Sequence, residues 1–259
     1  MTYLKKIRQT SPHIYSIMNE VASNFTANGI IAIGASPSIS NMPDEAEESG
    51  RNADAVILNA GTLSQERARA MLLAGESANH ANVPVLFDPI AVGATRFRTS
   101  VIYDVLDNVA LTAICANAGE IAVLAGALDK TESPDSAIEE NDPALAGQVA
   151  KKYESIVIAT GETDVITDGE RTVLCRNGDP MLTNITASGC LLTAIIGAFI
   201  SVAKDPLDAS VKGIAAYGIA AERAMQQAKG PGTFIPAFLD ELYTLTDKDI
   251  KAEKKLQVK

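Results

Sequence analysis

Two carboxylates in the chain follow short apolar runs that have the composition of buried strands. Asp88 comes directly after Val83–Phe87, and Glu120 comes shortly after Leu111–Cys115. If these runs are neighbouring parallel strands, both carboxylates lie at the carboxyl edge of one sheet, where α/β proteins bind ligands. Two carboxylates can hold Mg²⁺, which keeps most of its water ligands. The positions of Asp88 and Glu120 therefore predict a candidate magnesium site.

Each carboxylate also has a purely structural explanation. The spacing Asn117-x-x-Glu120 is that of a capping box, in which two side chains accept hydrogen bonds from each other's backbone amides. Asp88 precedes Pro89 and can cap a turn. Taken singly, each residue is better explained as a cap, so both interpretations stay open at this point.

A second candidate site is the stretch Thr186–Cys190, which opens an apolar helix. Small residues before a helix leave several backbone N–H groups directed to one place, and the helix dipole favours an anion there. The amides around Ser188 and Gly189 therefore predict a cradle for a phosphate group. The alternative is an ordinary loop with Ser188 as the N-cap, and the Walker pattern GxxxxGK[ST] is absent.

Cys190 is placed where such a cradle would lower the pKa of a thiol. It can then serve as a base or a nucleophile. The alternative is a small buried side chain at the start of an apolar helix. His13 and His80 are far away in the sequence, so a Cys–His dyad is not expected.

The elements that must position these residues alternate between strand and helix. Short apolar runs bounded by turn residues predict strands, and longer stretches between them predict helices. This alternation is typical of βαβ units with a parallel sheet covered on both faces. The predicted strands are Ala55–Asn59, Val83–Phe87, Leu111–Cys115 and Ser155–Ala159, and the predicted helices are Ser64–Asn79, Phe97–Leu106, Asn117–Leu124 and Pro143–Tyr153.

The pattern changes after residue 160. Val165–Thr167 and Arg171–Cys175 flank Asp168-Gly169, which predicts an antiparallel hairpin appended to the parallel sheet. The remaining chain is predicted to form the helices Ser188–Val202, Pro206–Ala228 and Pro236–Tyr243, with Lys229-Gly230-Pro231 as a stop signal. The lysine-rich tail predicts a solvated, frayed end. The acidic stretch Thr131–Asp142 is expected to be a loop.

Composition bounds the class of protein. The chain has 259 residues, of which 47% are apolar and 21% charged, and its formal net charge is −10. This excludes a mainly disordered chain and argues against nucleic acid and anionic membranes as partners. Three widely spaced cysteines and two histidines form neither a disulfide framework nor a zinc site. With no run of membrane-spanning length and no linker, we expect a single cytoplasmic domain over residues 1–259.

An ordered series of segments along almost the whole chain resembles the hydroxyethylthiazole kinase family, ribokinase-like kinases of thiamine salvage. Any one segment is a weak signal, but their order and spacing together are specific. The segments are Ser23–Gly29, Gly34–Pro37, Asn59–Leu63, Asp88–Ala94, Asn117–Ile121, Thr160-Gly161-Glu162-x-Asp164-Val165-Ile166, Gly189–Thr193 and Gly230–Gly232.

The resemblance implies a three-layer ribokinase-like α/β fold and phosphoryl transfer from ATP to the primary hydroxyl of a hydroxyethylthiazole. It implies a homotrimer with active sites between subunits. It also implies roles for residues of this chain: Mg²⁺ at Asp88 and Glu120; nucleotide at Cys115, Asn117, Thr160 and Gly189; the thiazole at Asn19, Ile39 and Ala187; and catalysis at Ser188, Gly189 and Cys190.

Three positions depart from the family pattern. Ala187 replaces a glycine, which costs on the order of 1 kcal/mol if the backbone there has positive φ. Cys115 replaces an arginine expected at the nucleotide, and a lost charge-assisted contact costs roughly 1.5–3 kcal/mol of binding. Ile39 replaces a methionine. These changes leave two alternatives open: a kinase for another small heterocyclic alcohol, or a non-catalytic binding protein.

Overall fold

A nine-stranded sheet runs through the molecule in the order β2-β1-β3-β4-β5-β6-β7-β8-β9. The computed structural model describes residues 2–128 and 140–259. The strands from β2 to β6 are parallel to their neighbours, and β7, β8 and β9 pair antiparallel. Their bounds are β1 His13–Ile17, β2 Ser36–Ile39, β3 Ala55–Asn59, β4 Val85–Asp88, β5 Ala113–Asn117, β6 Ile156–Thr160, β7 Asp164–Thr167, β8 Thr172–Cys175 and β9 Leu256–Val258.

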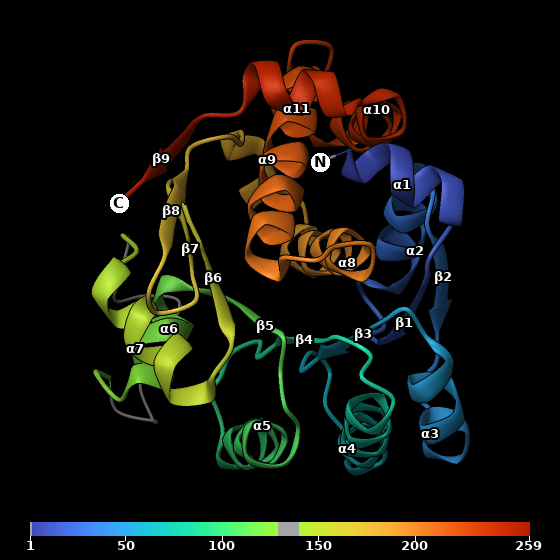
Figure 1. Ribbon diagram of the computed structural model, residues 1–259, viewed down its shortest axis with the longest axis vertical. Helices are drawn as coiled ribbons and strands as arrows, with labels where there is room; N and C mark the ends of the chain where they lie inside the picture. The colour runs from blue at the N-terminus through green and yellow to red at the C-terminus, as the bar shows by residue number, and fades with distance from the viewer. Residues whose placement is uncertain (1, 129–139) are drawn as a thin grey trace.

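Helices cover both faces of this sheet, which makes three layers (Figure 1). One face carries α1 Tyr3–Thr10, α2 Ser23–Ala32, α8 Ser188–Ser201, α9 Pro206–Met225, α10 Pro231–Thr244 and α11 Asp247–Glu253. The other carries α3 Pro43–Asn52, α4 Gln65–His80, α5 Arg96–Asn108, α6 Ala118–Ala125 and α7 Pro143–Tyr153. A 3₁₀ turn, η2, covers Pro180–Asn184. The predicted α/β class with an appended antiparallel hairpin is confirmed.

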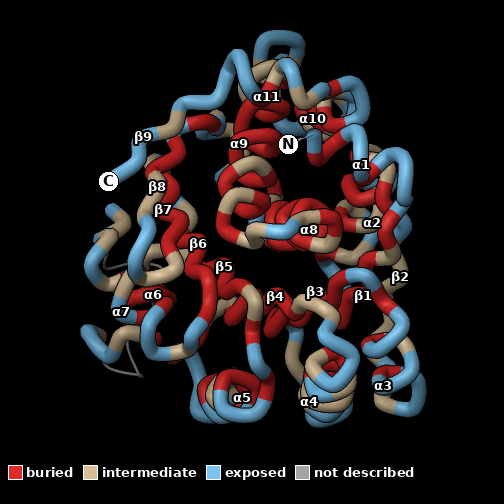
Figure 2. Tube along the Cα trace, in the orientation of Figure 1, coloured by how far each residue is buried: buried red, intermediate tan, exposed pale blue. Residues whose placement is uncertain are grey.

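Helix α8 lies in the centre of its layer and is buried on all sides (Figure 2). Every residue from Cys190 to Ile200 is buried, as expected for a helix that is apolar all round. It packs on β3 and β4 and against α2 and α9. Gly197 allows the approach to the sheet, because a Cβ there would lie 2.6 Å from Ile57 Cδ1. The rigid packing of α8 fixes where its first turn stands.

Two predictions for the C-terminal part are wrong. Helix α10 begins at Pro231, because proline at the first helical position starts a helix as well as ending the previous one; Pro236 lies inside it. The tail is not frayed, because α11 and β9 follow α10 and β9 pairs with β8. Its lysines are solvated, but its backbone forms the helix α11 and the strand β9.

Most of the acidic stretch Thr131–Asp142 lies outside the described residues. Within the described ranges, no helix combines the length and the apolar character needed to cross a membrane.

Candidate active site at the carboxyl edge of the sheet

The last residues of neighbouring parallel strands lie side by side. Asn59 of β3 is opposite Asp88 of β4, and Asn117 of β5 is opposite Thr160 of β6. The strand ends that the sequence singled out therefore meet at one edge of the sheet. This is the edge at which parallel α/β sheets bind ligands.

Asn59 connects the groups at this edge. Its side chain is fully buried, and its Nδ2 donates to Asp88 Oδ2 at 2.7 Å and lies 3.3 Å from the sulfur of Cys190. Its Oδ1 accepts from Asn19 Nδ2 at 2.8 Å and from Gly61 N at 3.0 Å. One amide thus joins a carboxylate, a thiol and the loops after β1 and β3.

The two candidate metal ligands are both buried, with 7% of Asp88 and 6% of Glu120 exposed. Burial, together with the negative charge of Glu120, raises the pKa of Asp88 well above its usual value. Two buried carboxylates that repel each other favour a bound cation. A site with only two carboxylates suits Mg²⁺, which retains water. Among the described residues no group of three or more His, Cys, Asp and Glu side chains is placed to hold a metal.

Glu120 is also the cap that the spacing predicted. Asn117 and Glu120 form a complete capping box at the start of α6. Glu120 Oε2 accepts from Asn117 N at 2.9 Å, and Oε1 accepts from Ala91 N at 2.7 Å. The cap turns the carboxylate toward the loop after β4. Capping and proximity to Asp88 are therefore compatible, and the two interpretations are not exclusive.

A half-buried arginine stands beside this carboxylate pair. Arg98 donates to the backbone oxygens of Ala60 and Ile90 and interacts with Glu120, while burial lowers its pKa. It ties together the loops that follow β3 and β4.

The start of α8 is the place at which the sequence predicts an anion cradle. Ala187 precedes the helix with φ 67°, in the left-handed region. Ser188 Oγ donates to Leu182 O at 2.9 Å, and Tyr217 Oη donates to Ser188 O at 2.7 Å. These bonds hold the turn. Ser188 N donates to Ile185 O at 3.4 Å, whereas the amides that follow it in the first turn have no acceptor inside the helix. Ser188 is thus the first helical residue and not the N-cap.

The backbone of Ala187 gives a stability prediction. Replacing Ala187 with glycine is expected to raise the free energy of unfolding by about 1 kcal/mol, because glycine adopts φ 67° without the Cβ penalty. Urea unfolding measures this change. Ala68→Gly is the matched control, since Ala68 lies inside α4 and has negative φ, and it is expected to lose stability. A loss of stability in Ala187→Gly contradicts the prediction.

The pKa of the Cys190 thiol is raised, whereas a cradle at the helix start was expected to lower it. Burial, and next the negative charge of Asp88, raise its pKa to about 12. The amides of Asn59 and Asn19 lower the pKa, but by less. Burial therefore has a larger effect on the pKa of this thiol than the start of the helix has, and the thiol stays protonated at neutral pH. Cys115 is also buried, its pKa is likewise raised to about 12, and it hydrogen-bonds Thr193 of α8.

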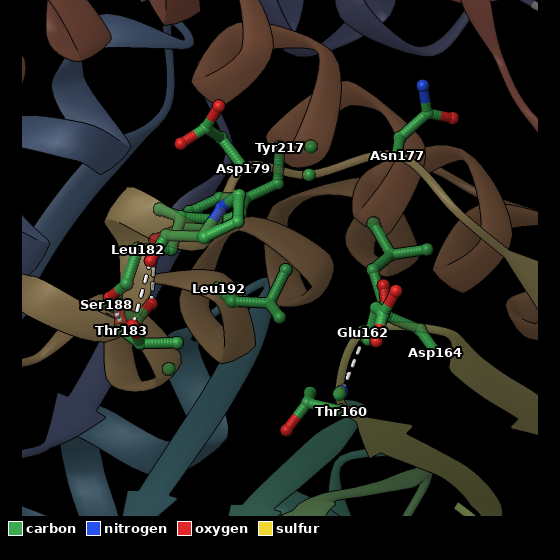
Figure 3. Close-up of a pocket in the computed structure, with 16 residues that line it drawn as sticks. Thr160, Glu162, Asp164, Asn177, Asp179, Leu182, Thr183, Ser188, Leu192 and Tyr217 are labelled. Atoms are coloured by element: carbon green, nitrogen blue, oxygen red, sulfur yellow. Dashed lines mark hydrogen bonds between the residues drawn. The ribbon is translucent and has the colours of Figure 1, made fainter. Parts of the chain in front are cut away.

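A cavity of about 550 Å³ lies beside the cradle (Figure 3). It is bounded by the β6–β7 turn, the segment after β8, the start of α8 and one side of α9. Of the predicted site residues, Thr160, Ser188 and Gly189 line it. Its complete lining is Thr160, Gly161, Glu162, Asp164, Asn177, Gly178, Asp179, Pro180, Leu182, Thr183, Ser188, Gly189, Leu192, Ile214, Tyr217 and Gly218.

Other predicted residues lie outside this lining. Asn19 is buried against Asn59, and its Nδ2 is 3.4 Å from the sulfur of Cys190. Ile39 ends the edge strand β2, opposite Ser16. Asn19 therefore lies with the thiol, and Ile39 lies two strands away from β3 along the same edge.

Several residues of this site received no role from the sequence. Asn59 and Asp164 lie in segments that carry the family resemblance, and Asn59 also ends a predicted strand, but neither was assigned a function. Asn177 and Tyr217 carry no local signal for a pocket, because distant elements bring them to it.

Asp164 is a buried carboxyl in the cavity wall, with 8% exposed. It accepts from Gly161 N at 3.0 Å and so holds the turn after β6. Burial raises its pKa from 3.8 to about 7, more than the Gly161 amide lowers it. The folded chain therefore holds an extra proton between about pH 4 and pH 7. The contribution of Asp164 to the free energy of unfolding falls as the pH rises through this interval.

Replacing Asp164 with asparagine is expected to raise the melting temperature at pH 8 by roughly 4 °C, and to leave it unchanged at pH 4. The amide oxygen still accepts from Gly161, but no buried charge forms at high pH. Melting curves from pH 4 to pH 8 measure the effect, with the exposed neighbour variant Glu162→Gln as the control. An equal shift at both pH values counts against a titrating Asp164.

The chain is similar to known proteins over almost its whole length. The sequence model described as the hydroxyethylthiazole kinase family matches residues 4–248. The chain is 60% identical over 255 residues to a protein of Oceanobacillus iheyensis called hydroxyethylthiazole kinase 2, covering 98% of this chain and 97% of that one.

Solved structures show the same fold. A hydroxyethylthiazole kinase structure from Pyrococcus horikoshii superposes with a TM-score of 0.91 at 36% identity, over 99% of this chain and 97% of that one. Pyridoxal kinase from Staphylococcus aureus, in complex with pyridoxal, has a TM-score of 0.65 at 14% identity and covers 96% of this chain and 98% of that one; this likeness concerns the fold alone and confirms the ribokinase-like prediction. The chain belongs to the hydroxyethylthiazole kinase family.

Proposed function

We propose that this enzyme transfers the γ-phosphoryl group of ATP to the hydroxyl of hydroxyethylthiazole, in thiamine salvage. The observation that carries the proposal is a single hydrogen-bonded cluster. Asn59 links the Asp88 carboxylate to Cys190 in the first turn of α8, which supports a cation site at Asp88 beside a phosphate cradle at the start of α8. Phosphoryl transfer needs this combination, because positioning and charge neutralisation supply most of its catalysis.

Asp88 and Glu120 would hold Mg²⁺, and the amides that open α8 at Ser188 and Gly189 would receive the phosphates. A bound Mg²⁺ supplies positive charge toward the phosphate oxygens. The cavity that Thr160 lines extends from the cradle and suits the rest of the nucleotide. Asn117, opposite Thr160, and the buried Cys115 border this side.

The acceptor alcohol would lie on the other side of the cradle, near Asn19, Ile39 and Ala187. The protonated Cys190 thiol contacts both Asn19 and Asn59 there. A thiol with a raised pKa does not take a proton from an alcohol at neutral pH. We assign Cys190 a role in placing the hydroxyl, and the loose transition state of phosphoryl transfer needs little help from a base.

We further propose a homotrimer with active sites between subunits, as in the resemblance described above. Two exposed apolar side chains support it: Val21 lies on the loop between β1 and α2, and Met42 on the loop between β2 and α3. Both loops leave the carboxyl edge that carries the site. Light scattering tests this, and a monomer mass would exclude it.

One domain and a cytoplasmic location complete the proposal. The single continuous sheet supports one domain over residues 1–259. The three cysteines are free thiols, which is typical of a reducing compartment.

ADP release by the purified protein tests the function. With Mg-ATP, release is expected to depend on added hydroxyethylthiazole and to stop when EDTA is added. Release without dependence on the thiazole excludes this acceptor. If the thiazole raises the melting temperature but no ADP forms, the protein binds its ligand without turnover, and the kinase proposal is wrong.

A further inference from the structure

The wall of the cavity includes a short piece of main chain that follows β8. Asn177 is 5% exposed, and Asn177, Gly178 and Asp179 all line the cavity. Asn177 lies directly on α9, since a Cβ at Gly218 would be 2.5 Å from the backbone carbon and oxygen of Asn177. Gly178 has φ 147°, a region that favours glycine. A segment of this kind is positioned by hydrogen bonds to its neighbours.

Those hydrogen bonds come from the C-terminal end of the chain. Asn177 Oδ1 accepts from Lys255 N at 2.7 Å, and Asn177 Nδ2 donates to Glu253 O at 3.0 Å. A single side-chain amide therefore pairs with one backbone donor and one backbone acceptor of the tail. Arg176 N also donates to Lys255 O at 3.0 Å. These hydrogen bonds are made immediately before β9 begins at Leu256.

Glu222 of α9 joins the tail to the same segment. Its Oε1 accepts from Gly178 N at 2.9 Å, from Asn177 Nδ2 at 3.2 Å and from Lys255 Nζ at 3.0 Å. The wall, α9 and the tail therefore share one carboxylate oxygen. Loss of the tail removes the Lys255 charge and leaves the Asn177 amide without its two backbone partners, which is costly for a buried amide.

The tail is itself anchored to α9. Arg223 Nη2 donates to Asp249 Oδ1 at 2.9 Å, and the Arg223 guanidinium also pairs with Glu253. This places the end of α11 before Lys255 reaches Asn177. The tail thus contacts the wall from a fixed position.

We propose that Asn177 is a positioning residue for the nucleotide, and that residues 253–255 act through it to set the cavity wall. This inference rests on the proposed function, because it takes the cavity as the nucleotide site. The Asn177 side chain points to the tail, while its backbone and Gly178 face the cavity. The tail, which the sequence presents as a charged end, becomes part of the binding machinery.

Steady-state kinetics test this proposal. Asn177→Ala is expected to raise KM for ATP about tenfold while kcat and KM for the thiazole change less than twofold, because only the distant wall is displaced. A chain ending at Ala252 lacks both backbone partners of Asn177 and should give the same increase without altering any cavity residue. The two changes combined should raise KM no further than either alone, since they break one interaction.

Gln257→Ala is the matched control. It removes the 3.2 Å bond between Arg176 and Gln257, which joins the same two segments but does not touch Asn177. It should leave KM for ATP unchanged. Variants that melt at lower temperature but keep the wild-type KM would show that the contact serves stability only, and would overturn the proposal.

Hydrogen exchange separates this proposal from the function on which it rests. The amides of residues 178–182 should exchange faster in Asn177→Ala and in the shortened chain, whether or not the enzyme turns over. If the exchange rates of these amides are unchanged in the variants, the tail does not position the cavity wall and the proposal is overturned. If exchange is faster in both variants but the wild-type protein releases no ADP, the contact between the tail and Asn177 is supported and the kinase proposal is overturned instead.

Discussion

Replacing Asp88 with asparagine is expected to lower kcat at least about 100-fold and to leave the melting temperature equal or higher. Asp88 contributes less to the local structure than Glu120: its carboxylate accepts from Asn59 Nδ2 and pairs with the Cys190 thiol, whereas Glu120 accepts two backbone amides. Asparagine still accepts the bond from Asn59 through its oxygen. It also removes a buried negative charge that Glu120 repels, so the protein without metal gains stability.

ADP release and thermal melting on the same samples check both parts of this result. Glu120→Gln is the companion variant, because glutamine is also found at this capping-box position. It should lose activity to a similar degree but some stability too, since both Glu120 oxygens accept backbone amides. If either variant keeps wild-type kcat, the metal site is assigned incorrectly.

Replacing Asn59 with aspartate is expected to lower the free energy of unfolding by about 3 kcal/mol and to abolish activity. The amide nitrogen that donates to Asp88 at 2.7 Å would become a second carboxylate oxygen. Two buried carboxylates at that distance must share a proton or repel each other. Urea unfolding at pH 7.5 measures the loss, and it should shrink at pH 5.

The double variant Asn59→Asp with Asp88→Asn provides the control. It exchanges the two groups, so that the amide now at position 88 donates to the carboxylate now at position 59. Asn19 and Gly61 continue to donate to the other oxygen. Most of the lost stability should return, while activity should not, because the metal-facing carboxylate has moved. If stability does not recover, the 2.7 Å bond is not the cause of the loss.

The centre of the fold could be predicted from local sequence. The apolar runs at β3, β5 and β6 are buried on both faces in a parallel sheet, so composition alone marks them. Ser64 caps α4 by accepting from Arg67 N, as its residue type predicts. The glycine that the family pattern has at position 187 raised the question of a positive φ there, and the structure answers it with φ 67°.

Local sequence predicted no helix or strand in the first 54 residues, although these residues form α1, β1, α2, β2 and α3. The strand β2 contains Pro37, which lacks an amide donor and is tolerated because β2 is the edge of the sheet. Helix α2 contains Gly29, which lies against Leu191 of α8. Both elements are stabilised by tertiary neighbours that override their local propensity.

The sequence by itself determined which chemical groups stand at the ends of the central strands: Asp88, Asn117, Thr160 and the turn before α8. Local hydrophobicity, capping and backbone chirality act over a few residues, so the sequence carries this information directly. The tertiary structure decided the ionisation of these groups and their partners. Cys190 and Asn19 meet across 171 positions, and packing around α8 keeps the thiol protonated. The tail reaches Asn177 across 78 positions. Burial and through-space charge depend on which distant elements pack together, and no local pattern encodes them.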